Sequence, residues 1–177
     1  MKKLLTIAAF AALVTASHAA TLSWQIAGIT SPTGVKQGLS VYLFITEQSS
    51  DFGAKTTSVD EITSLLKSKG DVSSYVAAEA TTTAAGGVPI ATGYNGGNFG
   101  AGDSLSGFAV VLDAANVASA NNYILTDVKH VEWKGATGAQ TMRFGSLANA
   151  TWTAVPEPST AVLALAGLAL LLKRRRA

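Results

Sequence analysis

The sequence predicts an all-β fold: an antiparallel β-sandwich of the Greek-key or jelly-roll kind with one short helix, and a small β-barrel as the alternative. Short runs of alternating, β-branched and aromatic residues recur along residues 20–155, enough for about seven to nine strands. One stretch, residues 58–70, follows a helical period instead. The chain has no cysteine, so its core alone is expected to hold the domain together.

The first two strands are expected at Thr21–Ile26 and Leu39–Thr46. The first alternates, with Leu22, Trp24 and Ile26 on one face, which places Trp24 in the core. The second is apolar on both faces, a pattern typical of a central strand that is covered on both sides.

Residues Ser58–Gly70 are expected to form a short helix packed on the sheet. Ser58 and Glu61 have the spacing of a capping box, and three apolar residues share one face at helical spacing. Gly70 is expected to close the helix, since glycine tolerates the left-handed backbone that often follows a last turn.

The second half of the domain is expected to hold the remaining strands. In a stretch rich in Ala, Thr and Gly, Thr81–Thr83 is a possible strand and Tyr94–Asp103 is expected to be a loop. Residues 113–122 are expected to form a turn or a single helical turn. The other expected strands are Phe108–Leu112, Tyr123–Thr126, Lys129–Trp133, Thr141–Phe144 and Asn149–Val155.

The N-terminus has the features of a secretory signal peptide over residues 1–19. Lys2 and Lys3 precede an apolar stretch, and small residues occupy the positions that a signal peptidase reads. Cleavage is therefore expected between Ala19 and Ala20. The apolar stretch is too short to remain as a membrane-spanning helix.

The C-terminal segment, residues 156–177, consists of Pro156, Glu157 and Pro158, then an apolar run and a basic cluster. The prolines keep the strip around Glu157 extended. The run is shorter than the roughly 20 residues of a full span, but it is apolar all round, and flanking cations can snorkel to the interface. We expect a membrane helix with its cations on the cytoplasmic side. The membrane residues are Ala161, Val162, Leu163, Ala164, Leu165, Ala166, Gly167, Leu168, Ala169, Leu170, Leu171 and Leu172, and the basic stop is Lys173, Arg174, Arg175 and Arg176.

This succession of a Pro-Glu-Pro motif, an apolar run and a basic cluster resembles the PEP-CTERM sorting signal of exported proteins in Gram-negative bacteria that carry an exosortase. The signal covers about an eighth of the chain. The resemblance implies recognition by a membrane protease-transpeptidase, cleavage near the motif, and release or attachment at the cell surface. It also implies a place among extracellular polymer or biofilm proteins, which are often glycosylated. It gives a route of export and no activity, and the mature domain resembles no family that we can name.

These features divide the chain into a signal peptide (1–19), an exported β-rich domain (20–155) and a sorting and anchor segment (156–177). The middle part holds seven basic and ten acidic residues, which gives a formal charge of about −3. A mildly acidic domain argues against nucleic acid as a partner.

No recognisable catalytic set is present, so the domain is expected to be non-enzymatic, without a cofactor or a metal site. His130 is expected to lie alone on the exposed face of a strand. Asp103, Asp113, Asp127 and Glu132 are candidates for the carboxylate pair of a secreted hydrolase, although acids at turns more often cap backbone groups.

A carbohydrate-binding module is the other alternative function. Trp133 and Trp152 have more polar neighbours than Trp24 and, with Tyr94, offer a surface on which sugars could stack, although packing in the core is the commoner role. The glycine-rich stretch at residues 96–105 departs from calcium-binding repeats and is expected to be a surface loop.

The favoured function is that of an exported, non-enzymatic protein of the cell surface or extracellular matrix, anchored transiently in the inner membrane. Its expected partners are signal peptidase, an exosortase-like enzyme and the membrane. Extracellular polysaccharide is a further candidate partner. Asn149 begins a glycosylation sequon, a weak signal in a bacterial protein.

Overall fold

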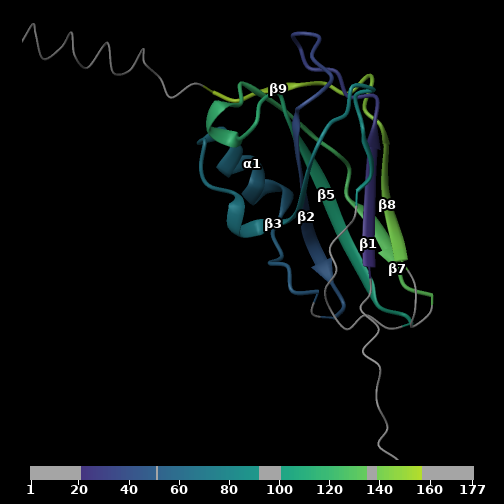
Figure 1. The fold of residues 1–177 in the computed structure, drawn as a ribbon. Helices are drawn as coiled ribbons and strands as arrows, with labels where there is room; N and C mark the ends of the chain where they lie inside the picture. The colour runs from purple at the N-terminus through teal and green to yellow at the C-terminus, as the bar shows by residue number, and fades with distance from the viewer. Residues whose placement is uncertain (1–20, 51, 92–100, 135–138, 157–177) are drawn as a thin grey trace, which may run out of the picture.

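The computed structural model describes residues 21–50, 52–91, 101–134 and 139–156, without the side chains of residues 90 and 91. Two β-sheets face each other, and a helix covers the outer face of the larger one (Figure 1). The smaller sheet has the strand order β4-β1-β8, formed by β1 (Thr21–Ala27), β4 (Val88–Ala91) and β8 (Ala139–Ser146).

The larger sheet has the order β3-β2-β5-β6-β9, with β7 also paired to β5. Its strands are β2 (Ser40–Gln48), β3 (Val76–Thr81), β5 (Ser104–Leu112), β6 (Asn122–Leu125), β7 (Lys129–Glu132) and β9 (Thr153–Ala154). The ladders of the two sheets are separate among the described residues, so the observed architecture is the predicted sandwich rather than the barrel.

One pairing departs from the predicted antiparallel arrangement. β1 and β8 are parallel, in a register that runs from Thr21 opposite Ala139 to Gln25 opposite Arg143. Between β1 and β8 the chain crosses to the larger sheet for β2 and β3, returns for β4, and crosses again for β5, β6 and β7. A connection that crosses between sheets permits parallel neighbours, whereas a tight hairpin does not.

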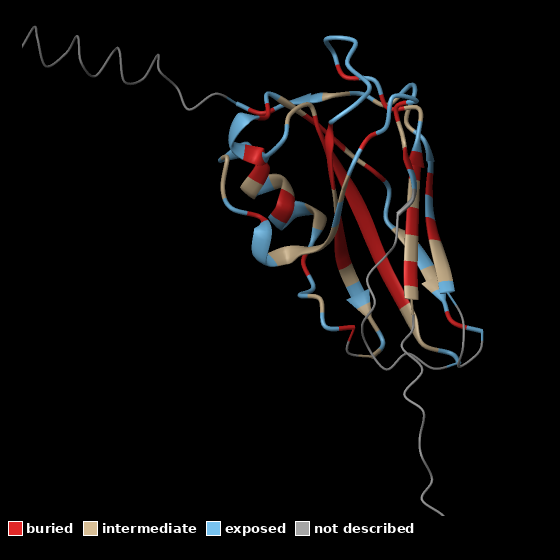
Figure 2. Cartoon of the chain, in the orientation of Figure 1, coloured by how far each residue is buried: buried red, intermediate tan, exposed pale blue. Residues whose placement is uncertain are grey.

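The central strands β2 and β5 are covered on both faces, as predicted for the second strand. On the inner face, Leu43 and Val111 belong to the same buried cluster as Trp24 of the smaller sheet. On the outer face, the rings of Phe44 and Phe108 stack with centroids 5.4 Å apart, within the cluster that includes the buried face of the helix. Figure 2 shows this buried centre continuing through β5.

The predicted helix is present as α1 (Val59–Lys67). Ser58 is its N-cap, since the hydroxyl oxygen of Ser58 accepts a 3.0 Å hydrogen bond from the backbone N–H of Glu61. The C-terminal end differs from the prediction, because Lys69, and not Gly70, has the left-handed backbone, with φ of 53°. The N–H of Gly70 bonds the carbonyl of Leu65 at 2.8 Å, which completes a Schellman motif with lysine at the usual glycine position.

Several predicted boundaries were wrong. Thr81 ends a strand rather than beginning one, because the chain then enters a turn closed by the N–H of Gly86 bonding the carbonyl of Thr83 at 2.8 Å. β4 was not predicted, and β5 begins four residues before the predicted strand. The expected helical turn is present as the 3₁₀ helix η2 (Val117–Ser119), and a second one, η1 (Ser73–Tyr75), follows α1.

The predicted strand Asn149–Val155 is reduced to the two residues of β9. The N–H of Ala150 bonds the carbonyl of Leu147 at 3.0 Å in a turn, and the indole N–H of Trp152 bonds the carbonyl of Thr30 at 2.8 Å. These contacts draw the chain towards the loop after β1 and away from a β-ladder.

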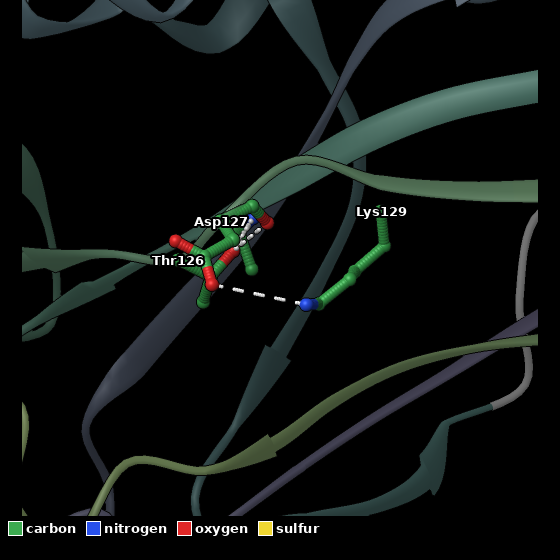
Figure 3. Close-up of polar contacts among 4 residues, drawn as sticks. Thr126, Asp127 and Lys129 are labelled. Carbon is green, nitrogen blue, oxygen red and sulfur yellow. Dashed lines mark hydrogen bonds and ion pairs between the residues drawn. The ribbon is translucent and has the colours of Figure 1, made fainter.

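β5 changes partner halfway along its length, from β6 to β7. At the change, Thr126 interrupts the partner strand, and its hydroxyl oxygen accepts a 2.9 Å bond from the N–H of Ala109 (Figure 3). The N–H of Thr126 bonds the carbonyl of Ala109 at 3.0 Å. Beside this buried site, Asp127 and Lys129 form an exposed ion pair at 3.8 Å.

Most of the loop predicted at Tyr94–Asp103 lies outside the described residues, as do the predicted signal peptide and the predicted helix at residues 161–172. Within the described part of the chain, no helix is long and apolar enough to cross a membrane.

Candidate functional site

The described fold ends where the predicted sorting motif begins. Val155 is buried with 4% of its side chain exposed, and its backbone N–H bonds the carbonyl of Asn121 at 2.8 Å. Pro156 follows directly and is exposed. Among the described residues, no spacer therefore separates the last buried side chain, Val155, from Pro156, the first residue of the motif.

β9 is a narrow attachment for this end of the chain. Thr153 pairs with Tyr123 and Ala154 with Asn122, and both β9 residues are exposed. Val155 belongs to the buried cluster on the outer face of the larger sheet, together with Val117 of η2 and Ile62 of α1. In Figure 1, β9 lies at the upper end of the sandwich, whereas β1 begins at the lower end.

Asp113 organises the turn that precedes β6. Its carboxylate accepts the N–H of Asn121 at 2.9 Å and the side-chain amide of Asn122 at 2.8 Å. Its own backbone N–H bonds the carbonyl of Asn122 at 3.1 Å. Asp113 thus fixes the strand to which β9 attaches, a backbone-capping role typical of acids at turns.

The other predicted residues of the export signals cannot be placed. Glu157 and Pro158 of the motif, the membrane residues 161–172, the basic stop 173–176 and the cleavage pair Ala19 and Ala20 lie outside the described residues.

A cleft of about 530 Å³ lies between the end of α1, β3 and η2. A neighbouring hollow of about 400 Å³ shares two of its lining residues, Tyr42 and Glu79, which lie opposite each other on β2 and β3. Burial raises the pKa of the Tyr42 phenol, and the negative charge of Glu79 raises it further. Polar residues lining the larger cleft include Tyr42, Lys69, Asp71, Ser73, Glu79 and Asn116.

Three of the four candidate acids of a hydrolase have hydrogen-bond or ion-pair partners of their own. Asp103 accepts a hydrogen bond from the Ser50 hydroxyl at 2.7 Å, Asp113 caps its turn, and Asp127 pairs with Lys129. Glu132 is exposed on β7. Among the described residues, no group of three or more His, Asp or Glu side chains is placed to hold a metal ion.

His130 is exposed on β7, as predicted. Its Nδ1 lies 3.0 Å from the hydroxyl oxygen of Ser106, the residue opposite on β5. Either atom can donate, depending on the tautomer of the imidazole. Ser106 is buried with 7% exposed, so this is a cross-strand pair on the sheet rather than an open nucleophile.

The tryptophans do not form an exposed platform. Trp24 is buried as predicted, and its indole nitrogen has no hydrogen-bond partner in the part of the chain that the structure describes. Trp133 is also fully buried and packs at 6.2 Å from Phe52, which excludes it from sugar stacking. Trp152 is half-buried. Tyr94 lies outside the described residues.

The glycine-rich stretch is described only from residue 101. There, Ala101 and Gly102 form a turn, and the N–H of Gly102 bonds the carbonyl of Trp133 at 2.7 Å. Asn149, the first residue of the sequon, is exposed.

Sequence reasoning missed the cleft, because its walls come from three separate stretches of chain. The one local signal was Asp71, whose carboxylate accepts the N–H of Ser73 at 2.8 Å. That bond turns the chain from α1 into η1 and so shapes one wall.

Comparison with known proteins gives one match, to a short segment. The family described as the PEP-CTERM protein-sorting motif matches residues 154–177. No curated protein and no solved structure matches the chain. The match begins at Ala154, so it overlaps the end of the fold as well as the segment beyond it.

Proposed function

Because the chain ends in a PEP-CTERM protein-sorting motif, which implies export and processing by an exosortase, we propose that residues 20–155 form a non-enzymatic domain of the cell surface or extracellular matrix. The observation that carries the proposal is the match itself, at residues 154–177. The structure supports it through Pro156, which emerges exposed directly after the buried Val155.

The proposed signal-peptide cleavage precedes the first described strand. β1 begins at Thr21, one residue after the proposed cleavage between Ala19 and Ala20. Cleavage there would leave the first strand intact. The proposed route is signal peptidase cleavage, transient anchoring through residues 161–172 with residues 173–176 in the cytoplasm, and exosortase cleavage near Pro156, Glu157 and Pro158.

The test is the intact mass of the protein recovered from the cell surface or medium. A mass that starts near Ala20 and ends near Pro156 is expected, and any excess would report attached sugar or polymer. Glu157→Ala, or deletion of residues 173–176, should leave the chain in the membrane with its tail. The proposal is wrong if the recovered protein still contains residues 161–177, or if both variants are released normally.

Binding of extracellular polysaccharide is a second candidate function, and the cleft beside Tyr42 favours it. A half-buried aromatic side chain among acceptors and donors is a common composition for sugar recognition. This places the candidate site at Tyr42 instead of the buried Trp133.

Affinity electrophoresis of the surface-recovered protein through gels containing the producing strain's own exopolysaccharide tests this candidate. Retardation should be lost in Tyr42→Ala and kept in Trp152→Ala. The reverse pattern would move the site to Trp152, and unretarded migration of the wild-type protein would rule out this function.

A further inference from the structure

The strand that ends the fold is also the start of the sorting match, and we infer that β9 is a releasable strap that must detach from β6 before the motif can be processed. The inference rests on the proposed function and adds a structural control to it. Ala154, Val155 and Pro156 belong to the match, while Ala154 pairs in the sheet and Val155 is buried.

When β9 is paired with β6, the motif lies only a short length of chain away from the folded domain. The motif ends at Pro158, the third residue after Val155, and a fully extended chain covers about 10 Å over three residues. This reach is about the same as the distance between two packed β-sheets. An enzyme that encloses an extended substrate would collide with the domain before it closed around the motif.

The residues on the N-terminal side of the motif are also engaged. The backbone N–H of Val155 is occupied by the carbonyl of Asn121, and the β9 residues are paired with Tyr123 and Asn122. Proteases commonly hold substrates as an added strand through these same backbone groups. The β6 edge and the enzyme therefore compete for one set of hydrogen-bonding groups.

The attachment is suited to local release. Within residues 153–156, Val155 is the one buried side chain, and β9 pairs with β6 alone among the described strands. The bonds of Asp113 lie within the turn and β6, so they can persist when β9 leaves. Segments with few buried contacts open locally at low free energy, and cleavage of an opened segment follows its open population.

A disulfide can lock the strap, and the chain contains no cysteine to interfere. Because Val155 and Asn121 form a hydrogen-bonded pair, the adjacent Asn122 and Ala154 form a non-hydrogen-bonded pair, in which side chains lie closest. The locking variant is Asn122→Cys/Ala154→Cys.

The matched control is Ser104→Cys/Glu132→Cys. These residues pair between β5 and β7, next to the bond from the N–H of Trp133 to the carbonyl of Asp103. They are therefore also a non-hydrogen-bonded antiparallel pair, in a part of the sheet away from β9.

Full-length chain is accumulated in an exosortase-bearing host before the enzyme is induced, and is oxidised in place. Loss of residues 161–177 is then followed by intact mass. The oxidised locking variant should lose its tail at least about tenfold more slowly than wild type. A reductant should raise the rate at least to that of wild type, which shows that the variant is folded and competent, since the reduced variant lacks the disulfide and also the Asn122 amide bond to Asp113. The oxidised control variant should match wild type throughout.

Two failures are distinguishable. If wild type and the oxidised locking variant lose their tails at the same rate, the inference that β9 must detach is wrong and the proposed function stands. If wild type keeps its tail after the enzyme is induced, the proposed function is wrong, and so is the inference about β9 that rests on it.

Discussion

The phenol of Tyr75 donates a hydrogen bond to the carboxylate of Glu61 across 2.6 Å, and this bond joins α1 to the 3₁₀ helix that follows it. Glu61 also accepts the Thr57 hydroxyl at 2.8 Å, and Lys55 lies 3.8 Å from the centre of the Tyr75 ring. The capping glutamate predicted from sequence thus also ties the helix to the chain on both sides of it.

These contacts predict a pH-dependent contribution to stability. The Tyr75 hydrogen bond first, and then the Thr57 hydroxyl, lower the pKa of Glu61. A carboxylate whose pKa is lower in the folded state stabilises the fold above its unfolded pKa, and that stabilisation is lost as the pH falls through the folded value. Glu61→Gln should lower the thermal midpoint at pH 7, and the difference from wild type should shrink as the pH falls through the lowered pKa of Glu61.

Tyr75→Phe should reproduce much of this loss at pH 7, whereas Asp60→Asn, in the same helical turn, should not. Thermal unfolding followed by circular dichroism at a series of pH values measures all three. A Glu61→Gln deficit that stays the same at every acidic pH at which the protein is folded would show that the carboxylate charge is not its cause.

Lys69→Gly should stabilise the protein by about 0.5–1 kcal/mol. Lys69 has φ of 53°, a backbone conformation that glycine adopts without steric cost. The substitution also removes the 3.4 Å contact of the Lys69 ammonium with the Ala118 carbonyl, and Lys69→Met isolates that loss. Urea denaturation should rank Lys69→Gly above wild type, and a ranking below Lys69→Met would contradict the account of the helix end.

Gly107→Ala should destabilise the protein by about 1–3 kcal/mol. Gly107 lies in β5, and a Cβ atom there would come 2.6 Å from the carbonyl oxygen of Phe44 on β2. The central strands would have to separate. Gly34→Ala is the comparison, because Gly34 has open space around it and only its φ of 83° opposes a side chain. Urea denaturation should show the larger loss for Gly107→Ala.

Asp113→Ala should cost about 1–3 kcal/mol, because it leaves the N–H of Asn121 and the amide of Asn122 without their acceptor. Amide hydrogen exchange should quicken at Val155, which depends on the same turn. Asp127→Ala removes only an exposed ion pair and should change stability by less than about 0.5 kcal/mol. Equal losses in both variants would contradict the role given to Asp113.

The sequence predicted those features that depend on a local pattern. A strand that is apolar on both faces identified β2 as central, and the Ser58–Glu61 spacing located the start of α1. The sorting motif was recognisable for the same reason, since it is a contiguous linear segment and its match is confirmed.

Features that depend on distant partners were not predictable. An alternating strand has the same pattern beside a parallel or an antiparallel neighbour, so the β1–β8 pairing was missed. The Asn149–Val155 pattern was misleading, because the bond from Trp152 to Thr30 spans most of the chain. The cleft beside Tyr42 likewise depends on how separate segments meet.

The parallel pairing of β1 and β8 has a consequence for the order in which the protein folds during export. On the proposed export route β1 crosses the membrane first, yet its ladder partner β8 follows roughly 120 residues later. The smaller sheet cannot be completed until nearly the whole domain has crossed the membrane, just before the C-terminal segment arrives. Until then, the edge of β1 that pairs with β8 has no partner, and an unpaired strand edge is a site at which other chains can associate.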